Sequence, residues 1–323
     1  MTALFIGQSP LQVLNLVEAS RLIEEDALFL LAWNNQQTRD QIDDLLKRLG
    51  VENVRFLRIS GVLRILYPVL LLPLAASLRG RVNRVYFGTY TSWASFLINL
   101  VGAKEHVLID DGQKTINILT APHLVGLEQK WRPWPWSRTY VLQAELFTFY
   151  DELAQSCGRR ARANRLDSVV SQLKQSSTGV QPAGPDDVLF IGTYLQDIYG
   201  PFESDLELVI KHAGERRLLY ILHRRDDEEH IRMLGAQLGF DVAKFDLPLE
   251  LVFNLLWSEH RPEVWTFGST ATDTIQAMLS ELRVRVFQLA PDGFTRERTG
   301  QAFLSIYEQY AENERTDLVT LNR

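Results

Sequence analysis

Hydrophobic residues in the first third of the chain fall into short runs that alternate with longer segments of helical spacing. The short runs predict strands at residues 3–6, 27–33, 54–57, 84–87 and 106–109. The periodic segments predict helices at residues 11–24, 38–49 and 92–100. Strands that alternate with helices are typical of βαβ units. We therefore expect a mostly parallel sheet covered by helices on both faces.

The same alternation starts again in the second half. An apolar run at 188–191 followed by Gly192 repeats the opening run at 4–6 followed by Gly7. Further strands are predicted at 218–222, 241–244, 263–267 and 284–289, and helices at 226–238, 249–257, 272–282 and 301–312. One helix is predicted over residues 151–173, between the two series.

The boundary between the two series is a segment at 175–187 that is rich in Ser, Gly and Pro, as linkers are. The 323 residues also suggest about two domains. We predict an N-terminal α/β domain at 1–180 and a C-terminal α/β domain at 181–323. Two such Rossmann-like domains would face each other across a cleft, where open α/β sheets bind ligands at the carboxyl ends of their strands.

The most apolar segment, residues 65–78, is interrupted by Pro68 and Pro73 and is too short to span a bilayer. The preferred interpretation is a buried helix with its connection. The alternative is contact with an anionic membrane surface, because four arginines flank the segment. These are Arg64, Arg79, Arg81 and Arg84.

A second unusual segment, residues 129–140, combines prolines with three tryptophans, Trp131, Trp134 and Trp136. Prolines at this density exclude a regular helix or central strand. The indoles would form an acceptor-binding wall or a membrane-facing patch, or would pack onto their own domain. The sequence leaves these alternatives open.

The net charge and the cysteine count exclude several classes of function. The formal net charge of −6 argues against a broad basic face for nucleic acid, but it allows a local cationic site. The single cysteine, Cys157, excludes an intrachain disulfide and fits a reducing compartment. The N-terminus resembles a first core strand and lacks the basic region of a signal peptide. We expect a cytoplasmic protein, with the inner membrane surface as an alternative location.

The first candidate for chemistry is Asp110-Asp111-Gly112, directly after a predicted strand. Adjacent carboxylates repel, and partial burial would raise the pKa of one of them. Such a group is suited to act as general base on a hydroxyl. Side chains alternate along a strand, so only one of the two should face the cleft. The ordinary alternative is a turn without function.

Cationic residues follow another predicted strand, at His223-Arg224-Arg225. The imidazole could donate a proton or a hydrogen bond to an anion, and arginines bind phosphates in a bidentate manner. We expect Asp226 to cap the following helix. The alternative is a solvated strand end.

A phosphate site is predicted at Gly268-Ser269-Thr270, between a strand and a helix. Backbone amides at the helix start, with the two hydroxyls, would cradle a phosphate. Plain helix capping is the common alternative. Neither a P-loop nor a Gly-x-Gly-x-x-Gly pattern is present. Glu250, at a turn entering a helix, could accept hydrogen bonds from a ribose or a base.

The order of these motifs resembles the bacterial GT-B sialyltransferases, namely the lipooligosaccharide sialyltransferases and polysialyltransferases. Those enzymes share an acidic-acidic-Gly triplet, a His-Pro pair and a pair of small hydroxyl residues. The first and third are matched by Asp110-Asp111-Gly112 and Ser269-Thr270, and Ser9-Pro10-Leu11-Gln12 is similar to the lipooligosaccharide group. The second motif differs from the His-Pro pair of those enzymes, because Arg224 follows His223 in place of the proline.

The resemblance implies an inverting transferase that moves a CMP-activated sialic acid or related nonulosonic acid to a hydroxyl of a cell-surface glycan. Asp110 or Asp111 would be the base and His223 would protonate or hydrogen-bond the departing phosphate. Donor-binding residues would be Gly7, Ser9, Gly192, His223, Arg224, Glu250, Gly268, Ser269 and Thr270. We expect no metal, no cofactor and no nucleic acid partner. The alternatives are a UDP- or GDP-sugar transferase and a non-catalytic protein of surface-polysaccharide assembly.

Overall fold

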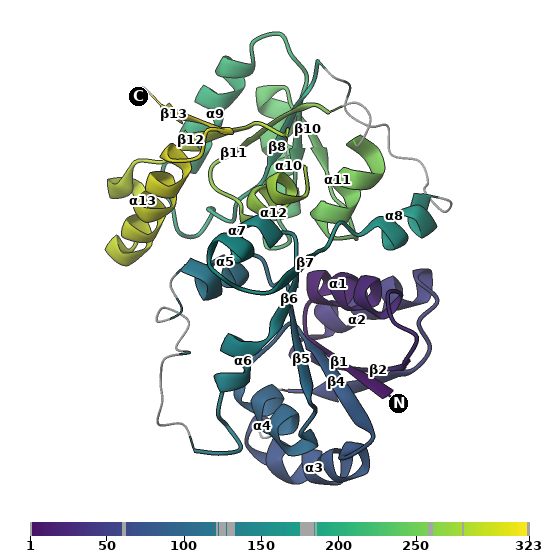
Figure 1. The fold of residues 1–323 in the computed structure, drawn as a ribbon. Coiled ribbons are helices and arrows are strands. Elements are labelled where there is room, and N and C mark those ends of the chain that lie inside the picture. Colours follow the sequence, from purple (N-terminus) through teal and green to yellow (C-terminus); the bar gives the residue numbers. More distant parts are fainter. Residues whose placement is uncertain are drawn as a thin grey trace. The chain divides into compact units, whose positions relative to one another are not determined.

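Alternating strands and helices build two parallel sheets in this computed structural model (Figure 1). The structure describes residues 2–59, 63–120, 122, 127, 133–174, 184, 186–257, 261–279 and 281–321. The chain forms two compact units, Met1–Ser177 and Thr178–Arg323. Most of the predicted linker at 175–187 lies outside the described residues.

The first unit contains a seven-stranded sheet in the order β3-β2-β1-β4-β5-β6-β7, and every pair is parallel. Its strands are β1 (Thr2–Gly7), β2 (Asp26–Trp33), β3 (Val54–Arg58), β4 (Val82–Phe87), β5 (Glu105–Ile109), β6 (Glu145–Thr148) and β7 (Ala161–Ala163). Its helices are α1 (Pro10–Ser20), α2 (Gln36–Arg48), α3 (Leu63–Leu78), α4 (Ser92–Val101), α5 (Gln113–Thr120), α6 (Thr139–Gln143), α7 (Asp151–Ser156) and α8 (Asp167–Lys174). Consecutive side chains of β1 are buried because both faces of the sheet are covered.

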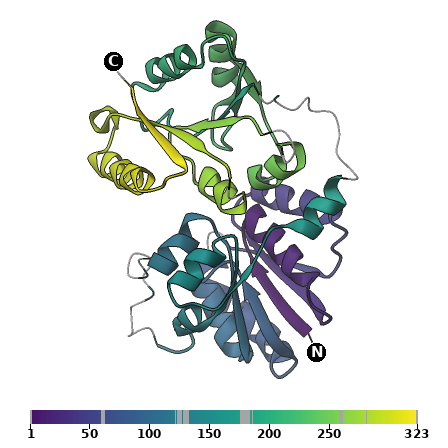
Figure 2. The same cartoon turned by 45° about the horizontal axis from the view of Figure 1, so that its top comes forward.

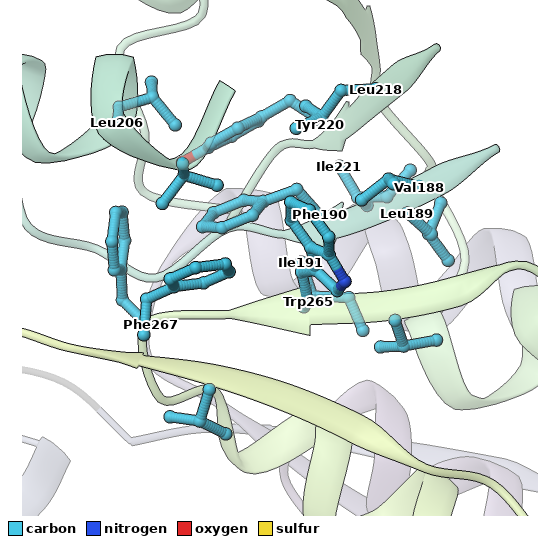
Figure 3. Close-up of a cluster of buried hydrophobic side chains, with 14 of the residues drawn as sticks. Val188, Leu189, Phe190, Ile191, Leu206, Leu218, Tyr220, Ile221, Trp265 and Phe267 are labelled. Carbon is cyan, nitrogen blue, oxygen red and sulfur yellow. The ribbon is translucent and has the colours of Figure 1, made fainter. Parts of the chain in front are cut away.

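The second unit contains a six-stranded parallel sheet in the order β10-β9-β8-β11-β12-β13, seen from another side in Figure 2. Its strands are β8 (Val188–Ile191), β9 (Leu218–Ile221), β10 (Asp241–Ala243), β11 (Glu263–Thr266), β12 (Val284–Gln288) and β13 (Thr316–Thr320). Its helices are α9 (Phe202–Ala213), α10 (Glu228–Leu238), α11 (Leu249–Trp257), α12 (Thr270–Met278), η1 (Pro291–Gly293) and α13 (Glu297–Ala311). Aromatic rings from β8, β9 and the β11 region fill its core, among them Phe190, Tyr220 and Phe267 (Figure 3).

Both sheets have the same topology at their centre. Each series of strands first extends outward on one side and then returns to the centre to continue on the other. The direction in which successive strands are added to the sheet therefore reverses between β1 and β4 in the first sheet and between β8 and β11 in the second. Open α/β sheets bind ligands outside the carboxyl ends of the strands at such switch points. The loops after these strands are the natural place for a site.

The segment after β6 differs from the predicted single helix at 151–173, which was wrong. It consists of α7, β7 and α8. Gly158, with φ of 69°, follows α7 in the left-handed conformation that glycine adopts easily. Glu18 of α1 then accepts hydrogen bonds from the backbone amides of Ser168 (3.1 Å) and Val169 (2.9 Å) in the first turn of α8. This carboxylate satisfies amides that a helix start leaves without intrahelical partners.

The apolar segment forms α3, with Pro68 and Pro73 inside the helix. The expectation of a buried helix holds for one face only: Leu71 and Ala75 are buried, whereas Val69 is 68% exposed. Among the described residues, no helix has the length and apolar character needed to cross a bilayer.

Candidate functional site

The carboxyl edge of the first sheet is packed closely around Gln12 of α1. A Cβ on Gly88, the residue after β4, would lie 2.6 Å from Cγ of Gln12. A Cβ on Gly7 would lie 2.8 Å from Cδ1 of Leu16. Glycine at these strand ends therefore lets α1 approach the switch point. Ser9 caps α1, since its side chain accepts a hydrogen bond from the Gln12 amide at 3.3 Å.

Asp110 is the first residue after β5 and is fully buried. Its Oδ1 accepts a hydrogen bond from the Thr148 hydroxyl, and its Oδ2 accepts one from the Phe149 amide, both at 2.6 Å. Burial raises the pKa of Asp110 to about 7, although these hydrogen bonds oppose the shift. Both oxygens thus hold the end of β6, and neither is directed at solvent.

Asp111 differs from its neighbour in exposure. Its side chain is partly exposed and forms an ion pair with Lys114 of α5. Its backbone amide donates a hydrogen bond to the Thr115 hydroxyl at 3.0 Å. Gly112, with φ of 63°, provides the turn into α5. Of the two predicted carboxylates, Asp111 is therefore the one that an external hydroxyl can reach.

Tyr90 lies beside this carboxylate, in the loop after β4. Burial, together with the charge of Asp111, raises the pKa of Tyr90. The guanidinium of Arg138 lies 5.5 Å from the centre of the Tyr90 ring. Neither the phenol beside Asp111 nor the arginine beside that phenol was predicted from the sequence.

The second sheet positions Gly192 after β8, at its switch point. A Cβ on Gly192 would lie 2.7 Å from the backbone oxygen of Ile221 and 3.0 Å from the backbone nitrogen of His223. The Gly192 amide donates a hydrogen bond to the same Ile221 oxygen at 2.9 Å. Glycine is thus required for the close packing that positions the His223 loop.

His223 follows β9 and is half-buried. Its Nδ1 accepts a hydrogen bond from the Arg225 amide at 3.2 Å, so in the neutral imidazole the proton is on Nε2. Burial, with the charges of Arg224 and Arg225, lowers the pKa of His223 to about 4. At neutral pH the side chain is therefore an uncharged Nε2–H donor.

Asp226 supports this loop. The prediction that it caps the following helix was wrong. The cap of α10 is Asp227, whose side chain accepts a hydrogen bond from the His230 amide at 3.2 Å. Asp226 Oδ2 instead accepts hydrogen bonds from the His223 amide (2.9 Å) and from the Tyr220 hydroxyl (3.3 Å). Burial raises the pKa of Asp226 to about 6. The carboxylate thus holds the backbone at His223.

The predicted phosphate cradle lies at the start of α12. Ser269 is the N-cap residue, but its side chain makes no capping hydrogen bond. Its hydroxyl and the exposed Thr270 are therefore available to a ligand at the positive end of the helix. Gly268 has φ of 131°, and its amide donates a hydrogen bond to the Thr266 hydroxyl at 3.1 Å. This fixes the turn between β11 and α12.

Two carboxyl groups with raised pKa values lie in neighbouring helices. Glu250, in the first turn of α11, is buried, and burial raises its pKa to about 7. Burial likewise raises the pKa of Asp273, in the first turn of α12, to about 7, although a hydrogen bond with Tyr310 opposes this. A fully ionised carboxylate beside the cradle would repel a phosphate, so a raised pKa of Asp273 favours anion binding.

Tyr194 is a second aromatic residue that sequence reasoning missed. It follows β8, and its ring centre lies 6.2 Å from that of His223. The Arg225 guanidinium lies 5.9 Å from the Tyr194 ring centre. The sequence does contain a signal, because Gly-Thr-Tyr occurs at both switch points, ending at Tyr90 and at Tyr194.

The tryptophans at residues 129–140 do not all have the same environment. Trp136 packs onto its own unit: its Nε1 donates a hydrogen bond to the Tyr67 hydroxyl at 2.7 Å, and its ring lies 5.5 Å from that of Phe96. Trp134 is 67% exposed. Trp131 lies outside the described residues.

The predicted site residues lie in two groups, one at the carboxyl edge of each sheet. Gly7, Ser9, Asp110 and Asp111 lie along the carboxyl edge of the first sheet. The other predicted residues follow strands of the second sheet: Gly192, His223, Arg224, Glu250, Gly268, Ser269 and Thr270. Within the described ranges, no group of three or more His, Cys, Asp or Glu side chains is placed to hold a metal ion.

No protein-family model matches the chain, and no curated protein matches it by sequence. Its structure is similar to that of UDP-GlcNAc 2-epimerase from Neisseria meningitidis bound to UDP-GlcNAc, with 12% identity, a TM-score of 0.56, and coverage of 97% of this chain and 92% of that chain. It is also similar to a putative UDP-N-acetylglucosamine 2-epimerase from Listeria monocytogenes, with 15% identity, a TM-score of 0.56, and coverage of 99% and 84%.

A third similar structure is UGT89C1 of Arabidopsis thaliana complexed with UDP-L-rhamnose, with 12% identity, a TM-score of 0.53, and coverage of 99% and 84%. At these identities the likeness establishes the fold alone. The predicted fold class is confirmed: the chain has the two Rossmann-like α/β domains of the GT-B fold.

Proposed function

We propose that this chain is a glycosyltransferase that uses a nucleotide-sugar donor, and that the donor is a CMP-activated sialic acid or related nonulosonic acid. The observation that carries the proposal is the set of groups at the second switch point. An uncharged His223 Nε2–H donor, the Ser269 hydroxyl and the start of α12 follow strands on either side of β8 in one parallel sheet. Similar structures contain UDP-sugars, which supports a nucleotide-sugar site in general.

In the proposed reaction, the second unit would stabilise the leaving nucleotide phosphate. The start of α12, with the hydroxyls of Ser269 and Thr270, would bind the phosphate oxygens. His223 Nε2–H would donate a hydrogen bond to the oxygen that gains charge as the glycosidic carbon–oxygen bond breaks. Arg224, which is exposed, would neutralise part of the remaining charge.

The first unit would activate the acceptor. Asp111 would take the proton of the attacking hydroxyl while that oxygen forms the new bond to the sugar, on the face opposite the nucleotide. The product is then an inverted glycoside and free CMP. Asp110, whose oxygens are both occupied, would hold the strand end and would not take part in proton transfer.

The test measures the melting temperature of the purified chain with CMP, UDP, GDP and ADP and with CMP- and UDP-sugars. A ligand that binds the folded state raises the melting temperature. We expect the largest shift with CMP and CMP-sugars, and CMP release when a glycan acceptor is added. No shift with any cytidine nucleotide at millimolar concentration would contradict the proposed donor.

A UDP-sugar transferase is the second candidate, favoured by the UDP-sugars in the similar structures. It predicts a shift with UDP and UDP-sugars in the same panel and none with CMP. Turnover with either donor would exclude a non-catalytic assembly role.

A further inference from the structure

Helix α3 has an exposed face that is apolar. Leu66, Val69, Leu70 and Leu72 expose between 46% and 68% of their surface. Spacings of three or four residues connect positions 66, 69, 70, 72 and 73, so they lie on one side of the helix. Pro73 is also exposed. A surface helix normally presents polar residues on this side.

The opposite side of α3 is buried in the first unit. Leu71, Ala75 and Leu78 are buried, and α3 lies beside α4 in the fold (Figure 1). The helix is therefore anchored in the first unit and presents a second apolar face to the outside. Contiguous exposed apolar surface of this kind marks an interaction site.

The charged side chains that lie near α3 in the sequence are of one sign. From residue 53 to residue 103 the sequence contains six arginines and no Asp or Glu, although the whole chain has a net charge of −6. Arg79 and Arg81, directly after α3, are both exposed. These two arginines make the end of α3 complementary to an anionic partner, whereas Arg84 is paired with Glu105 of β5.

An exposed tryptophan belongs to the same unit. Trp134 is 67% exposed and lies two residues before Trp136, which donates a hydrogen bond to Tyr67 of α3. Tryptophan is enriched where an apolar ring meets a hydrated lipid headgroup region. Exposed apolar side chains, adjacent arginines and an exposed tryptophan in the same unit together favour contact with a membrane surface.

We propose that the exposed face of α3 binds the surface of an anionic lipid bilayer. Leu66, Val69, Leu70 and Leu72 would enter the boundary between headgroups and acyl chains. Arg79 and Arg81 would contact the acidic headgroups. This inference does not depend on the proposed function, because it concerns a different surface and requires no turnover.

The test is flotation of the purified full chain with vesicles of phosphatidylcholine alone or mixed with phosphatidylglycerol. We expect binding to the mixed vesicles that weakens as salt is added. Val69→Asp should lower the partition coefficient by about tenfold or more, because it places a charge on the inserted face. The matched control is Met233→Asp, at a residue of α10 that is 51% exposed, which should bind like the wild type.

A second pair of variants isolates the charge contribution. Arg79→Gln with Arg81→Gln should lower binding to mixed vesicles by about fivefold for each arginine at low salt. Arg298→Gln, at an exposed residue of α13, should leave binding unchanged. All of these positions are exposed, so circular dichroism and melting temperature should match the wild type.

Three results would overturn the proposal. The first is failure of the wild type to bind mixed vesicles. The second is wild-type binding by Val69→Asp. The third is a dimer in solution that Val69→Asp dissociates, without vesicle binding by either form, since the face would then join two copies of the chain.

Discussion

The two adjacent carboxylates can be separated by conservative substitution. Asp110→Asn keeps the shape of a protonated carboxyl group: its oxygen can accept the Phe149 amide, and its NH₂ can donate to the Thr148 hydroxyl. Asp111→Asn removes a carboxylate that is partly exposed and whose ion pair with Lys114 contributes little to stability. Asp110→Asn therefore removes an ionisable group but keeps the structural hydrogen bonds, whereas Asp111→Asn removes the carboxylate that is proposed to act as the base.

The magnitudes follow from burial and hydrogen bonding. Asp110→Ala leaves the buried Phe149 amide without its acceptor, and a buried unsatisfied group costs about 1–3 kcal/mol. Below about pH 4, where Asp110 is protonated in the folded and the unfolded chain, Asp110→Asn should change stability by less than about 1 kcal/mol, because both hydrogen bonds can be kept. Loss of a general base lowers turnover by about 10²–10⁴-fold. We assign that loss to Asp111→Asn.

The assay measures CMP release with a CMP-sugar and an acceptor glycan, together with thermal unfolding of each variant. We expect Asp110→Asn to retain most of the turnover, Asp111→Asn to lose it with an unchanged melting temperature, and Asp110→Ala to melt earlier. The opposite pattern, in which Asp110→Asn is well folded and inactive while Asp111→Asn is active, would refute the assignment of the base.

Three further predictions concern the second unit and pH. His223→Asn should lower turnover about 10²–10⁴-fold without changing the melting temperature, and NMR titration should show that the pKa of the free wild-type imidazole lies well below 6.5; an ordinary titration would contradict the buried neutral form. Gly192→Ala should destabilise the second unit by about 1–3 kcal/mol, because its Cβ would meet backbone atoms, and urea unfolding of an unaffected variant would show that the loop can move. The raised pKa values of Asp110, Glu250 and Asp273 mean that the folded chain holds protons that the unfolded chain has released, so stability should fall as pH rises from about 4 to about 7. Asp110→Asn should make that slope less steep in urea titrations, and an unchanged slope would contradict the raised pKa of Asp110.

The fold could be predicted where the burial of an element determines the pattern of apolar residues in its sequence. Strands buried on both faces appear as continuous apolar runs, and β1, β2, β8 and β9 were found in this way. β7 was missed because Ala161–Ala163 contains no such run, and its place is set by pairing with β6. Pairing between distant segments is a tertiary effect that periodicity does not report.

The candidate site was predictable to a smaller extent. Polar residues at strand ends pointed to Asp111, His223 and Ser269, because parallel strands place their carboxyl ends at one edge. The sequence could not separate Asp110 from Asp111, since their difference arises from hydrogen bonds to Thr148 and Phe149, about forty residues away. It also could not show that Asp227, and not Asp226, caps α10.

The capping of α8 by Glu18 has a consequence for dividing the chain. The carboxylate joins the last helix of the first unit to its first helix, through the amides of Ser168 and Val169. An N-terminal fragment that stops before Asp167 would leave this buried carboxylate without its donors. A fragment that ends after Lys174 retains them, so this is the natural limit of a first unit expressed or exchanged as a module.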